Sequence, residues 1–387
     1  MPTKKTKVIL GLMTTVTVLI IACSKNEKEI SPEEAVAKYL NLPSTPFNYG
    51  NPTLPFYLTS SQIERQINTP ASNQITDFGA TLGRVLFYDK TLSKNKTISC
   101  ANCHKQENAF SDFEILSKGF NGGLTRRNSM SLVNAKYYFN GKFFWDQRAA
   151  TLEQQVLMPI QDLVEMGITL DELVKRVQDQ PYYPPLFTQA FGSSTINSDL
   201  ISKALSQFIR SIISYQSKYD QGRSTFPPLQ ALLPDTPFPN FTAQENRGKE
   251  IFLTPFDGCV TCHGSETFIA PDVKNNGLDA TITDPGYGAV FNIPANRGLF
   301  KVTSLRNVEL TAPYMHDGRF STLEEVIEHY NSGVKAHPNL SFQLKQLNGQ
   351  PRLMNLSADD KSALVAFLKT LTDRNVTTDV KYSNPFK

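Results

Sequence analysis

Two short segments of the chain carry the residue pattern C-x-x-C-H. The first, CANCH, spans residues 100–104, and the second, CVTCH, spans residues 259–263. In this pattern the two thiols can form thioethers with the vinyl groups of a haem, and the following histidine can bind the iron. Zinc sites and redox dithiols also use C-x-x-C, but two copies that both end in histidine predict two covalent c-type haems. The predicted attachment residues are Cys100, Cys103, His104, Cys259, Cys262 and His263.

The first 22 residues have the pattern of a bacterial lipoprotein signal peptide. Three lysines precede an apolar run over residues 8–21, and the small Ala22 stands before Cys23. Cleavage before Cys23 and acylation of its thiol would anchor the protein to a membrane by a lipid. The alternative is an uncleaved anchor helix, for which the apolar run is short. We expect a periplasmic protein, and Ser24 gives no signal for inner-membrane retention, which favours the outer membrane.

Charge and cysteine usage narrow the class of protein. The formal net charge is +3, and residues 1–22 contain three lysines and no acidic residue, so the rest of the chain carries no net charge. A nucleic-acid surface needs a basic patch, and this balance argues against one. The four cysteines after Cys23 all belong to the two C-x-x-C-H segments, so no thiol is left for a disulfide.

Helical signals recur in the same order around each C-x-x-C-H segment. Apolar residues at helical spacing predict a helix that starts near Asp77, as N-cap, and another over residues 198–219. In the second half, Thr242-x-x-Glu245 and Ser357-x-x-Asp360 are helix-capping patterns. Strand signals are few. We therefore predict an all-α fold with two cytochrome c-like domains, each with one covalently bound c-type haem.

The predicted organisation has four parts. Residues 1–22 are a signal peptide, residues 23–65 a tether, residues 66–235 the N-terminal domain with the first haem, and residues 236–387 the C-terminal domain with the second haem and a C-terminal tail. A proline-rich stretch over residues 226–239 marks the boundary. The last residues, 374–387, are expected to form a loose tail that can pack back on the first domain.

Several further segments give the chain a resemblance to a known family. They are FFWDQRAA at residues 143–150, the glutamines 154–155, VEM at residues 164–166 and TAPYMHDG at residues 311–318. Together with both haem motifs, they resemble the bacterial di-haem cytochrome c peroxidases, and within these the MauG-like branch. The resemblance covers roughly residues 70–373.

The resemblance implies catalytic roles for three residues. Glu165 corresponds to the carboxylate that handles peroxide protons at the N-terminal haem, Gln155 to its amide partner, and Trp145 to the tryptophan between the haems. Breaking an O–O bond requires a proton to move between the two oxygens, which a carboxylate within hydrogen-bond reach can do. Read without the family, Glu165 is a surface glutamate at a helix end and Trp145 a core aromatic residue.

The resemblance also implies one calcium ion that bridges the two domains. Its ligands correspond to Asn128, Thr311 and Pro313, mostly through carbonyl oxygens, which are ligands that Ca²⁺ accepts. The alternative is ordinary turn chemistry at these positions.

Two departures from the peroxidase pattern concern the axial ligands. Many of these peroxidases have a distal histidine at the N-terminal haem, but residues 118–124 contain none. We therefore predict that this haem has an open axial position. At the C-terminal haem the methionine ligand of the peroxidases is replaced by Tyr330, as in MauG-like proteins.

Helical spacing independently favours Tyr330. Leu323, Val326, Ile327 and Tyr330 would lie on one buried face of a helix capped by Ser321-x-x-Glu324. His329 would lie about 100° around the helix, on its wetter side. His329 as ligand, or no protein ligand at all, are the alternatives, and Met315 and Met354 are weaker candidates. We expect His316 near the haem–haem interface. It could have a redox role there, and the alternative is a structural role in which it holds a loop by hydrogen bonds. We expect His337 at the surface.

Three functions are compatible with these residues. The first is a cytochrome-c peroxidase-like oxidoreductase that reduces hydrogen peroxide at the N-terminal haem, with electrons from a small cytochrome c or cupredoxin relayed through the C-terminal haem. The second is a MauG-like oxidase that modifies aromatic side chains of a partner protein. The third is a non-enzymatic electron-transfer lipoprotein, which requires both irons to be six-coordinate. No motif in the chain points to a particular oligomeric state.

Overall fold

The computed structural model describes residues 1–3, 31–227, 230–270 and 272–387. Contacts between residues separate Met1–Ser31 from Pro32–Lys387, and the description that follows concerns this second unit. From residue 4 onward the predicted signal peptide, together with Cys23, lies outside the described residues, so the lipid anchor stays a prediction. None of the helices found in the described ranges has the length and apolar character that a bilayer crossing requires.

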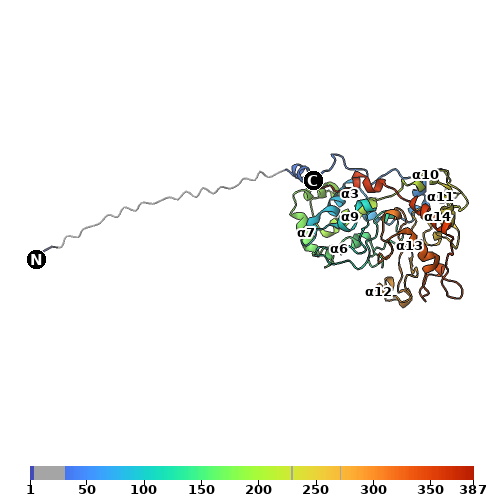
Figure 1. Ribbon diagram of the computed structural model, residues 1–387. Coiled ribbons are helices and arrows are strands. Elements are labelled where there is room, and N and C mark those ends of the chain that lie inside the picture. Colours follow the sequence, from blue (N-terminus) through green and yellow to red (C-terminus); the bar gives the residue numbers. More distant parts are fainter. Residues whose placement is uncertain (4–30, 228–229, 271) are drawn as a thin grey trace. The chain divides into compact units, whose positions relative to one another are not determined.

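Helices and loops make up nearly all of the second unit, as predicted (Figure 1). Up to residue 223 the helices are α1 (Pro32–Tyr39), α2 (Ser61–Glu64), α3 (Asp77–Tyr88), α4 (Cys100–Cys103), α5 (Leu152–Gln155), α6 (Met158–Gln161), α7 (Leu170–Gln178), α8 (Tyr183–Phe191), α9 (Ser198–Ser211) and α10 (Lys218–Arg223). Beyond residue 230 they are α11 (Ala243–Leu253), α12 (Tyr287–Val290), α13 (Leu323–Glu328), α14 (Ala358–Lys369) and α15 (Asn375–Thr378). Strands β1 (Val273–Lys274) and β2 (Phe300–Lys301) pair antiparallel, with Val273 opposite Lys301.

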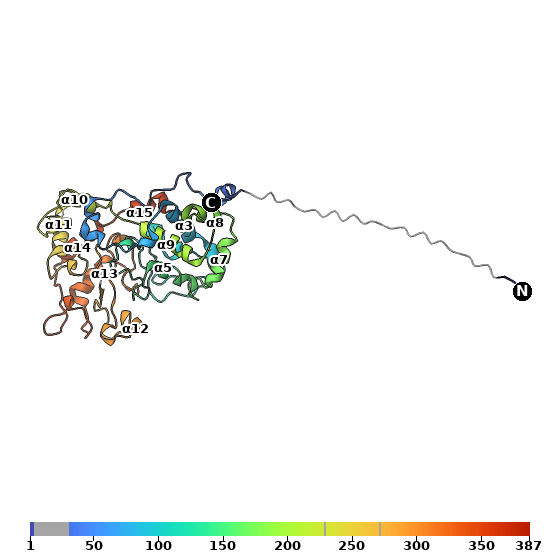
Figure 2. The same cartoon turned by 180° about the vertical axis from the view of Figure 1, so that it is seen from behind.

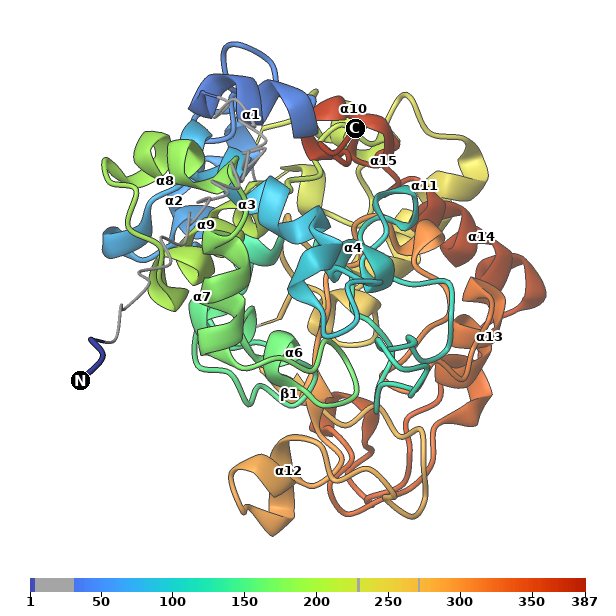
Figure 3. The same ribbon diagram turned by 90° about the vertical axis from the view of Figure 1, so that its left-hand side faces the viewer.

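The same helix pairing occurs once beside each C-x-x-C-H segment. Helix α3 packs on α9, and α11 packs on α14. Each crossing has a glycine where the backbones meet: a Cβ atom on Gly83 would lie 2.0 Å from the carbonyl oxygen of Ala204, and one on Gly248 would lie 1.9 Å from that of Ala363. Only glycine permits so close an approach. Figure 3 shows α4, which carries the first C-x-x-C-H segment, beside α3.

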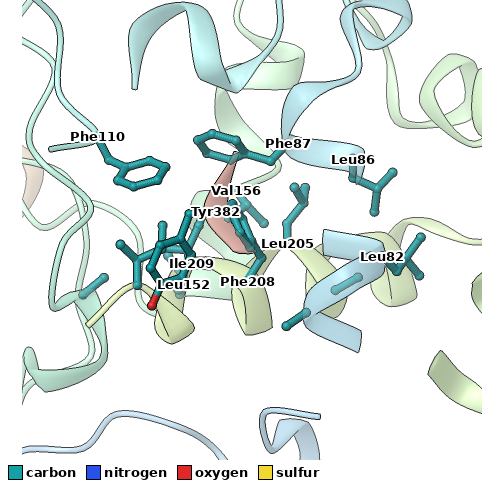
Figure 4. Close-up of a cluster of buried hydrophobic side chains, with 14 of the residues drawn as sticks. Leu82, Leu86, Phe87, Phe110, Leu152, Val156, Leu205, Phe208, Ile209 and Tyr382 are labelled. Carbon is teal, nitrogen blue, oxygen red and sulfur yellow. The ribbon is translucent and has the colours of Figure 1, made fainter. Parts of the chain in front are cut away.

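Two hydrophobic clusters underlie these helix pairs. The first contains Leu82, Phe87 and Phe208 from α3 and α9 (Figure 4), and the second contains Phe252 and Phe367 from α11 and α14. The clusters do not follow the chain order strictly. Tyr382, near the C-terminus, belongs to the first cluster, whereas Tyr219 from α10 belongs to the second. The division into domains at residues 235 and 236 stays a prediction.

Residues inside the predicted tether are folded onto the first cluster. Leu40 and Tyr49 are both 2 % exposed, and the backbone of Leu40 forms an antiparallel bridge with Phe386. Although most of it is exposed, the described part of the predicted tether, from residue 31 to 65, is therefore anchored to the folded unit at several buried residues. The reason is the C-terminal segment, which returns beside α1 in Figures 1 and 2 and supplies its partners. Residues 374–387 are not loose, because they form α15 and bury Tyr382, but they do pack back on the first cluster as expected.

Several predicted helix ends need correction. Asp77 is the first helical residue and not the cap: the Thr76 side chain accepts the N–H of Gly79, while Asp77 accepts the N–H groups of Tyr49 and Gly50. The helix predicted over residues 198–219 is two helices, α9 and α10, with a break after Ser211. The caps that begin at Thr242 and Ser357 are confirmed.

Candidate functional site

The two motif histidines are held in the same way. His104 Nδ1 donates to the carbonyl oxygen of Phe110 at 2.9 Å, and His263 Nδ1 donates to that of Phe268 at 3.1 Å. Because a carbonyl only accepts, Nδ1 carries the proton and the lone pair of Nε2 is left for a metal. Burial lowers the pKa of both imidazoles, that of His263 to about 4, so both rings are neutral. A neutral imidazole is the form that binds iron.

The motif cysteines are arranged for attachment of a macrocycle. Cys100 and Cys103 lie on the single turn of α4, and Cys259 lies on a 3₁₀ turn, Cys259–Thr261, that ends just before Cys262. All four thiols are free. Side chains three positions apart on a helical turn share a face, so each pair presents two thiols beside its histidine. The donor set at both motifs fits a covalently bound c-type haem.

A cavity of about 560 Å³ opens at the second motif. Cys259, Cys262 and His263 line it together with Tyr330. This volume is in the range of pockets that hold small molecules and cofactors. The cavity also reaches residues of several other segments, among them Trp145, Asn276, Met315, His316 and Met354. The structure therefore brings Tyr330 and both weaker methionine candidates to the same space as His263.

His329 does not line this cavity. It is 6 % exposed, and its Nε2 donates to the carbonyl oxygen of Asn276 at 2.9 Å. The expectation that His329 faces the wetter side was wrong. Helix α13 is capped by Thr322 with Glu325, one residue later than predicted, and it ends at Glu328 in a π-helical turn, His329–Gly333. A π turn holds an extra residue, which changes the faces of the residues that follow.

Burial raises the pKa of the Tyr330 hydroxyl to about 12, and a hydrogen bond with the Asn276 side chain acts in the opposite direction. The phenol is therefore neutral without a metal. A cation beside it would favour the phenolate. Tyr330 as an axial ligand stays a prediction.

Glu165 lies near the first motif. Burial, with a smaller contribution from the Asp162 carboxylate, raises its pKa to about 7, and Arg148 opposes this. Burial raises the pKa of the Cys100 and Cys103 thiols, and the Glu165 charge adds a smaller contribution to both, so the carboxylate lies within electrostatic range of the first motif. Its backbone is held in place because its carbonyl accepts the N–H of Phe120 at 2.9 Å. A carboxyl with this pKa can hold or release a proton near neutral pH.

Gln155 and Trp145 occupy different positions relative to the two motifs. Gln155 is the half-buried last residue of α5. Trp145 lines the cavity of the second motif, and its Nε1 donates to the carbonyl oxygen of Asn128 at 2.8 Å. Its ring meets His316 edge to face, with 6.4 Å between ring centroids, and His316 stacks on Phe300 at 3.8 Å. His316 is thus buried among aromatic rings.

Residues 128–131 connect the two motifs, a relationship that the sequence did not reveal. The Asn128 carbonyl receives the Trp145 indole at 2.8 Å, and the Met130 backbone slightly opposes the effect of burial, which lowers the pKa of the His104 ring. Ser131 Oγ donates to the carbonyl oxygen of Ala109, just before Phe110. These contacts use backbone atoms, which leave no mark on residue type.

Asn128, Thr311 and Pro313 also line the cavity, so the structure brings the three predicted calcium ligands to one region. The Asn128 amide nitrogen donates to the carbonyl oxygens of Glu114 and Ile115 at 3.3 and 3.2 Å. In the described parts of the chain, no three His, Cys, Asp or Glu side chains gather as a metal site would need. A calcium ion here would depend on carbonyl and amide oxygens, and it stays a prediction.

His337 is half-buried in its own loop, where its Nδ1 accepts the N–H of Asn339.

The chain has two C-x-x-C-H segments, and in each the histidine is oriented by a hydrogen bond to a backbone carbonyl and lies beside a pair of packed helices. These features define the class of c-type cytochromes with two attachment motifs. Residues 78–224 match the family described as di-haem cytochrome c peroxidase. The chain is 34 % identical over 305 residues to methylamine utilization protein MauG of Methylorubrum extorquens, covering 78 % of this chain and 80 % of that protein. It is 32 % identical over 297 residues to cytochrome c551 peroxidase of Nitrosomonas europaea, covering 76 % and 79 %. The chain belongs to the di-haem cytochrome c peroxidase and MauG family.

Solved structures agree with this assignment. A MauG-like protein associated with microbial copper homeostasis matches with a TM-score of 0.73 and 32 % identity, over 87 % of this chain and 99 % of that one. The di-haem peroxidase BthA of Burkholderia thailandensis matches with a TM-score of 0.65 and 22 % identity, over 81 % and 91 %, and shows the shared fold. The family implies two c-type haems.

Proposed function

We propose that the protein is a di-haem peroxidase that reduces hydrogen peroxide at the first motif with electrons that enter through the second. The observation that carries the proposal is Glu165, a buried carboxyl with a pKa of about 7 whose charge acts on Cys100 and Cys103. When bound, a c-type haem supplies the redox-active iron, and an open axial position at the first motif would admit peroxide. Residues 118–124 contain no histidine that could occupy this position.

Glu165 would act as the proton carrier. Its ionised form can accept a proton from peroxide, and its neutral form can return that proton to the departing oxygen. Near pH 7 both forms are populated, so neither transfer needs a large change in pKa. Gln155, from α5, would orient the peroxide by its amide.

Trp145 would carry electrons between the motifs. Its ring lines the cavity at the second motif. Its indole nitrogen donates a hydrogen bond to Asn128, in the 128–131 segment that continues to the surroundings of His104. The hydrogen bond to Asn128 holds the ring in one orientation.

A specific observation also favours the second candidate, a MauG-like oxidase with a protein substrate. Tyr330 lines the same cavity as His263, where peroxidases of the family have methionine. A phenolate ligand favours higher oxidation states of iron, whereas a thioether favours the reduced state. A second haem with Tyr330 as ligand is thus poorly matched to ordinary cytochrome donors.

Two further elements complete the proposal. A calcium ion held by Asn128, Thr311 and Pro313 would join the halves of the molecule, and a lipid on Cys23 would anchor the protein at the periplasmic side of the outer membrane. The support for the first is that the three residues line one cavity, and for the second the lipobox form of the sequence before Cys23.

The test uses the holoprotein with both haems attached. Its resting optical and EPR spectra are recorded, followed by peroxide addition with and without a reduced small cytochrome c or cupredoxin. A high-spin ferric signal and donor oxidation support the peroxidase. Peroxide-dependent modification of a co-purified protein, without donor oxidation, supports the MauG-like alternative. Two low-spin irons that do not respond to peroxide would leave the electron-transfer lipoprotein as the function.

A further inference from the structure

Three candidate axial ligands converge on one asparagine. Asn276 follows β1 and lines the cavity at the second motif together with Tyr330 and Met315. Its Nδ2 donates to Met315 Sδ at 3.3 Å, and its side chain is also a hydrogen-bond partner of the Tyr330 hydroxyl. Its backbone carbonyl accepts the Nε2 proton of His329 at 2.9 Å. A primary amide has two N–H groups, so one side chain can serve Met315 and Tyr330 together.

The backbone of Asn276 is held firmly on both sides. Asn275 exchanges hydrogen bonds with Ser341, through its N–H to the hydroxyl at 2.9 Å and through its carbonyl to the Ser341 N–H at 3.1 Å. Gly277 donates its N–H to the Asn275 side chain at 2.8 Å and accepts the Lys335 N–H at 2.8 Å. Gly277 has φ +72°, and a Cβ atom there would meet Val334 at 2.6 Å. The asparagine is thus a rigid reference point for its three contacts.

Each contact has a different effect on the candidate ligand. The carbonyl of Asn276 occupies Nε2 of His329, which keeps that ring away from the cavity. The N–H on Met315 engages one of the two sulfur lone pairs and holds the thioether beside Asn276. An N–H donated to a phenolate oxygen, in contrast, stabilises the charged form that binds iron.

We propose that Asn276 is the positioning residue that selects Tyr330, over His329 and Met315, as the axial ligand of the second haem. The inference rests on the proposed function, because it requires a haem at the second motif with Tyr330 as its ligand. It adds that the choice is made by a loop residue that does not itself bind the iron.

The experiment compares the holoprotein with the variants Asn276→Leu, Asn276→Asp and Asn276→Leu combined with Met315→Leu. Leucine removes both amide contacts and leaves the carbonyl on His329. We expect the tyrosinate charge-transfer band of the second ferric haem to weaken in Asn276→Leu, and a thioether-type spectrum to appear. The reduction potential should rise by at least about 59 mV, which is a ten-fold shift of a one-electron equilibrium. The thioether signal should vanish in the double variant.

Asn276→Asp is a second, nearly isosteric test in case leucine disturbs folding. It replaces the N–H donor by a carboxylate next to the phenolate, so the tyrosinate band should weaken here as well. Asn339→Leu, in a loop residue that does not line the cavity, is the matched control and should leave spectrum and potential unchanged.

The two levels of the hypothesis fail in different ways. A wild-type holoprotein without a tyrosinate band, with a spectrum equal to that of Tyr330→Phe, would refute Tyr330 as ligand and the inference with it. A wild-type tyrosinate band that persists, with an unchanged potential, in both folded Asn276 variants would overturn the role of Asn276 and leave the proposed function standing.

Discussion

The indole Nε1 of Trp145 donates a 2.8 Å hydrogen bond to the carbonyl oxygen of Asn128. Asn128 stands two residues before Met130, whose backbone contacts the His104 ring. The segment that accepts the Trp145 indole at the cavity of the second motif therefore continues to the surroundings of His104 in the first motif. Neither end of it requires a side chain of unusual chemistry.

Replacement of Trp145 by phenylalanine should slow electron exchange between the two sites. Phenylalanine keeps an aromatic ring but has no N–H for Asn128, and the loss of one buried hydrogen bond should cost about 1 kcal/mol of stability. Stopped-flow spectra after peroxide addition would follow both haems. Phe139→Leu, at an exposed aromatic residue, is the control. An exchange rate equal to that of the wild type would remove Trp145 from the path.

Replacement of Glu165 by glutamine should lower the rate of reaction with peroxide by about 10²- to 10⁴-fold, the usual contribution of a general acid–base group. In the wild type the rate should rise toward pH 7, because the carboxylate must be ionised to accept the first proton. The variant should lose this pH dependence. Asp162→Asn removes a charge that raises the pKa of Glu165, so it should move the rise to lower pH. A pH profile that is identical in all three proteins would contradict the role of Glu165.

The same shift predicts how stability depends on pH. The pKa of Glu165 is raised from 4.5 to about 7 in the folded protein, so the folded state binds more protons than the unfolded state between these values. The contribution of Glu165 to the free energy of unfolding should therefore be greatest at low pH and should fall as pH rises from 4.5 to about 7. The measurement is the difference in urea midpoint between wild type and Glu165→Gln at several pH values. A difference that grows in the other direction would show that the carboxyl is not buried.

Replacement of Tyr330 by methionine should raise the reduction potential of the second haem, because a thioether favours ferrous iron and a phenolate favours ferric iron. Spectroelectrochemical titration of the holoprotein would measure it. His329→Gln keeps an N–H donor for the Asn276 carbonyl and should have little effect, since His329 does not line the cavity. If His329→Gln changes the second haem and Tyr330→Met does not, the ligand assignment is reversed.

A buried ion pair next to the second motif should dominate local stability. Arg306, with a fully buried side chain, donates twice to Asp220 at 2.9 Å, and Tyr57 donates to the same carboxylate at 2.7 Å. Asp220→Asn would leave the guanidinium without its counter-charge, which typically costs about 3–5 kcal/mol. The exposed pair Lys175–Asp179 is the comparison, and Asp179→Asn should cost less than about 1 kcal/mol. Chemical denaturation of both variants would check the contrast, and equal losses would refute it.

The extent to which the sequence predicted the site depended on how local each feature is. The cap at Thr242 involves residues within three positions of one another, and the structure confirms it. The two C-x-x-C-H segments are equally local, and each histidine bonds to a backbone carbonyl a few residues later. The position of His329 was mispredicted because a π turn depends on packing against Asn276, more than fifty residues earlier. Periodicity assumes a regular helix and cannot register such a turn.

Contacts through the backbone were also invisible to the sequence. The Met130 contact with His104 and the carbonyl of Asn276 would form with many residue types at these positions. Likewise, the packing of Leu40 depends on Phe386, at the opposite end of the chain. The polar and proline-rich composition around Leu40 is typical of a linker, and only the distant partner makes it part of the core.

The insertion of Tyr382 into the first hydrophobic cluster has a consequence for biogenesis. The ribosome produces the chain from its N-terminus, so residues 100–104 emerge long before Tyr382 and before the Val380 carbonyl that Arg84 binds at 2.9 Å. The first hydrophobic cluster can therefore complete its packing only when nearly the whole polypeptide is present. Until that last segment is in place, the first hydrophobic cluster lacks the buried ring of Tyr382.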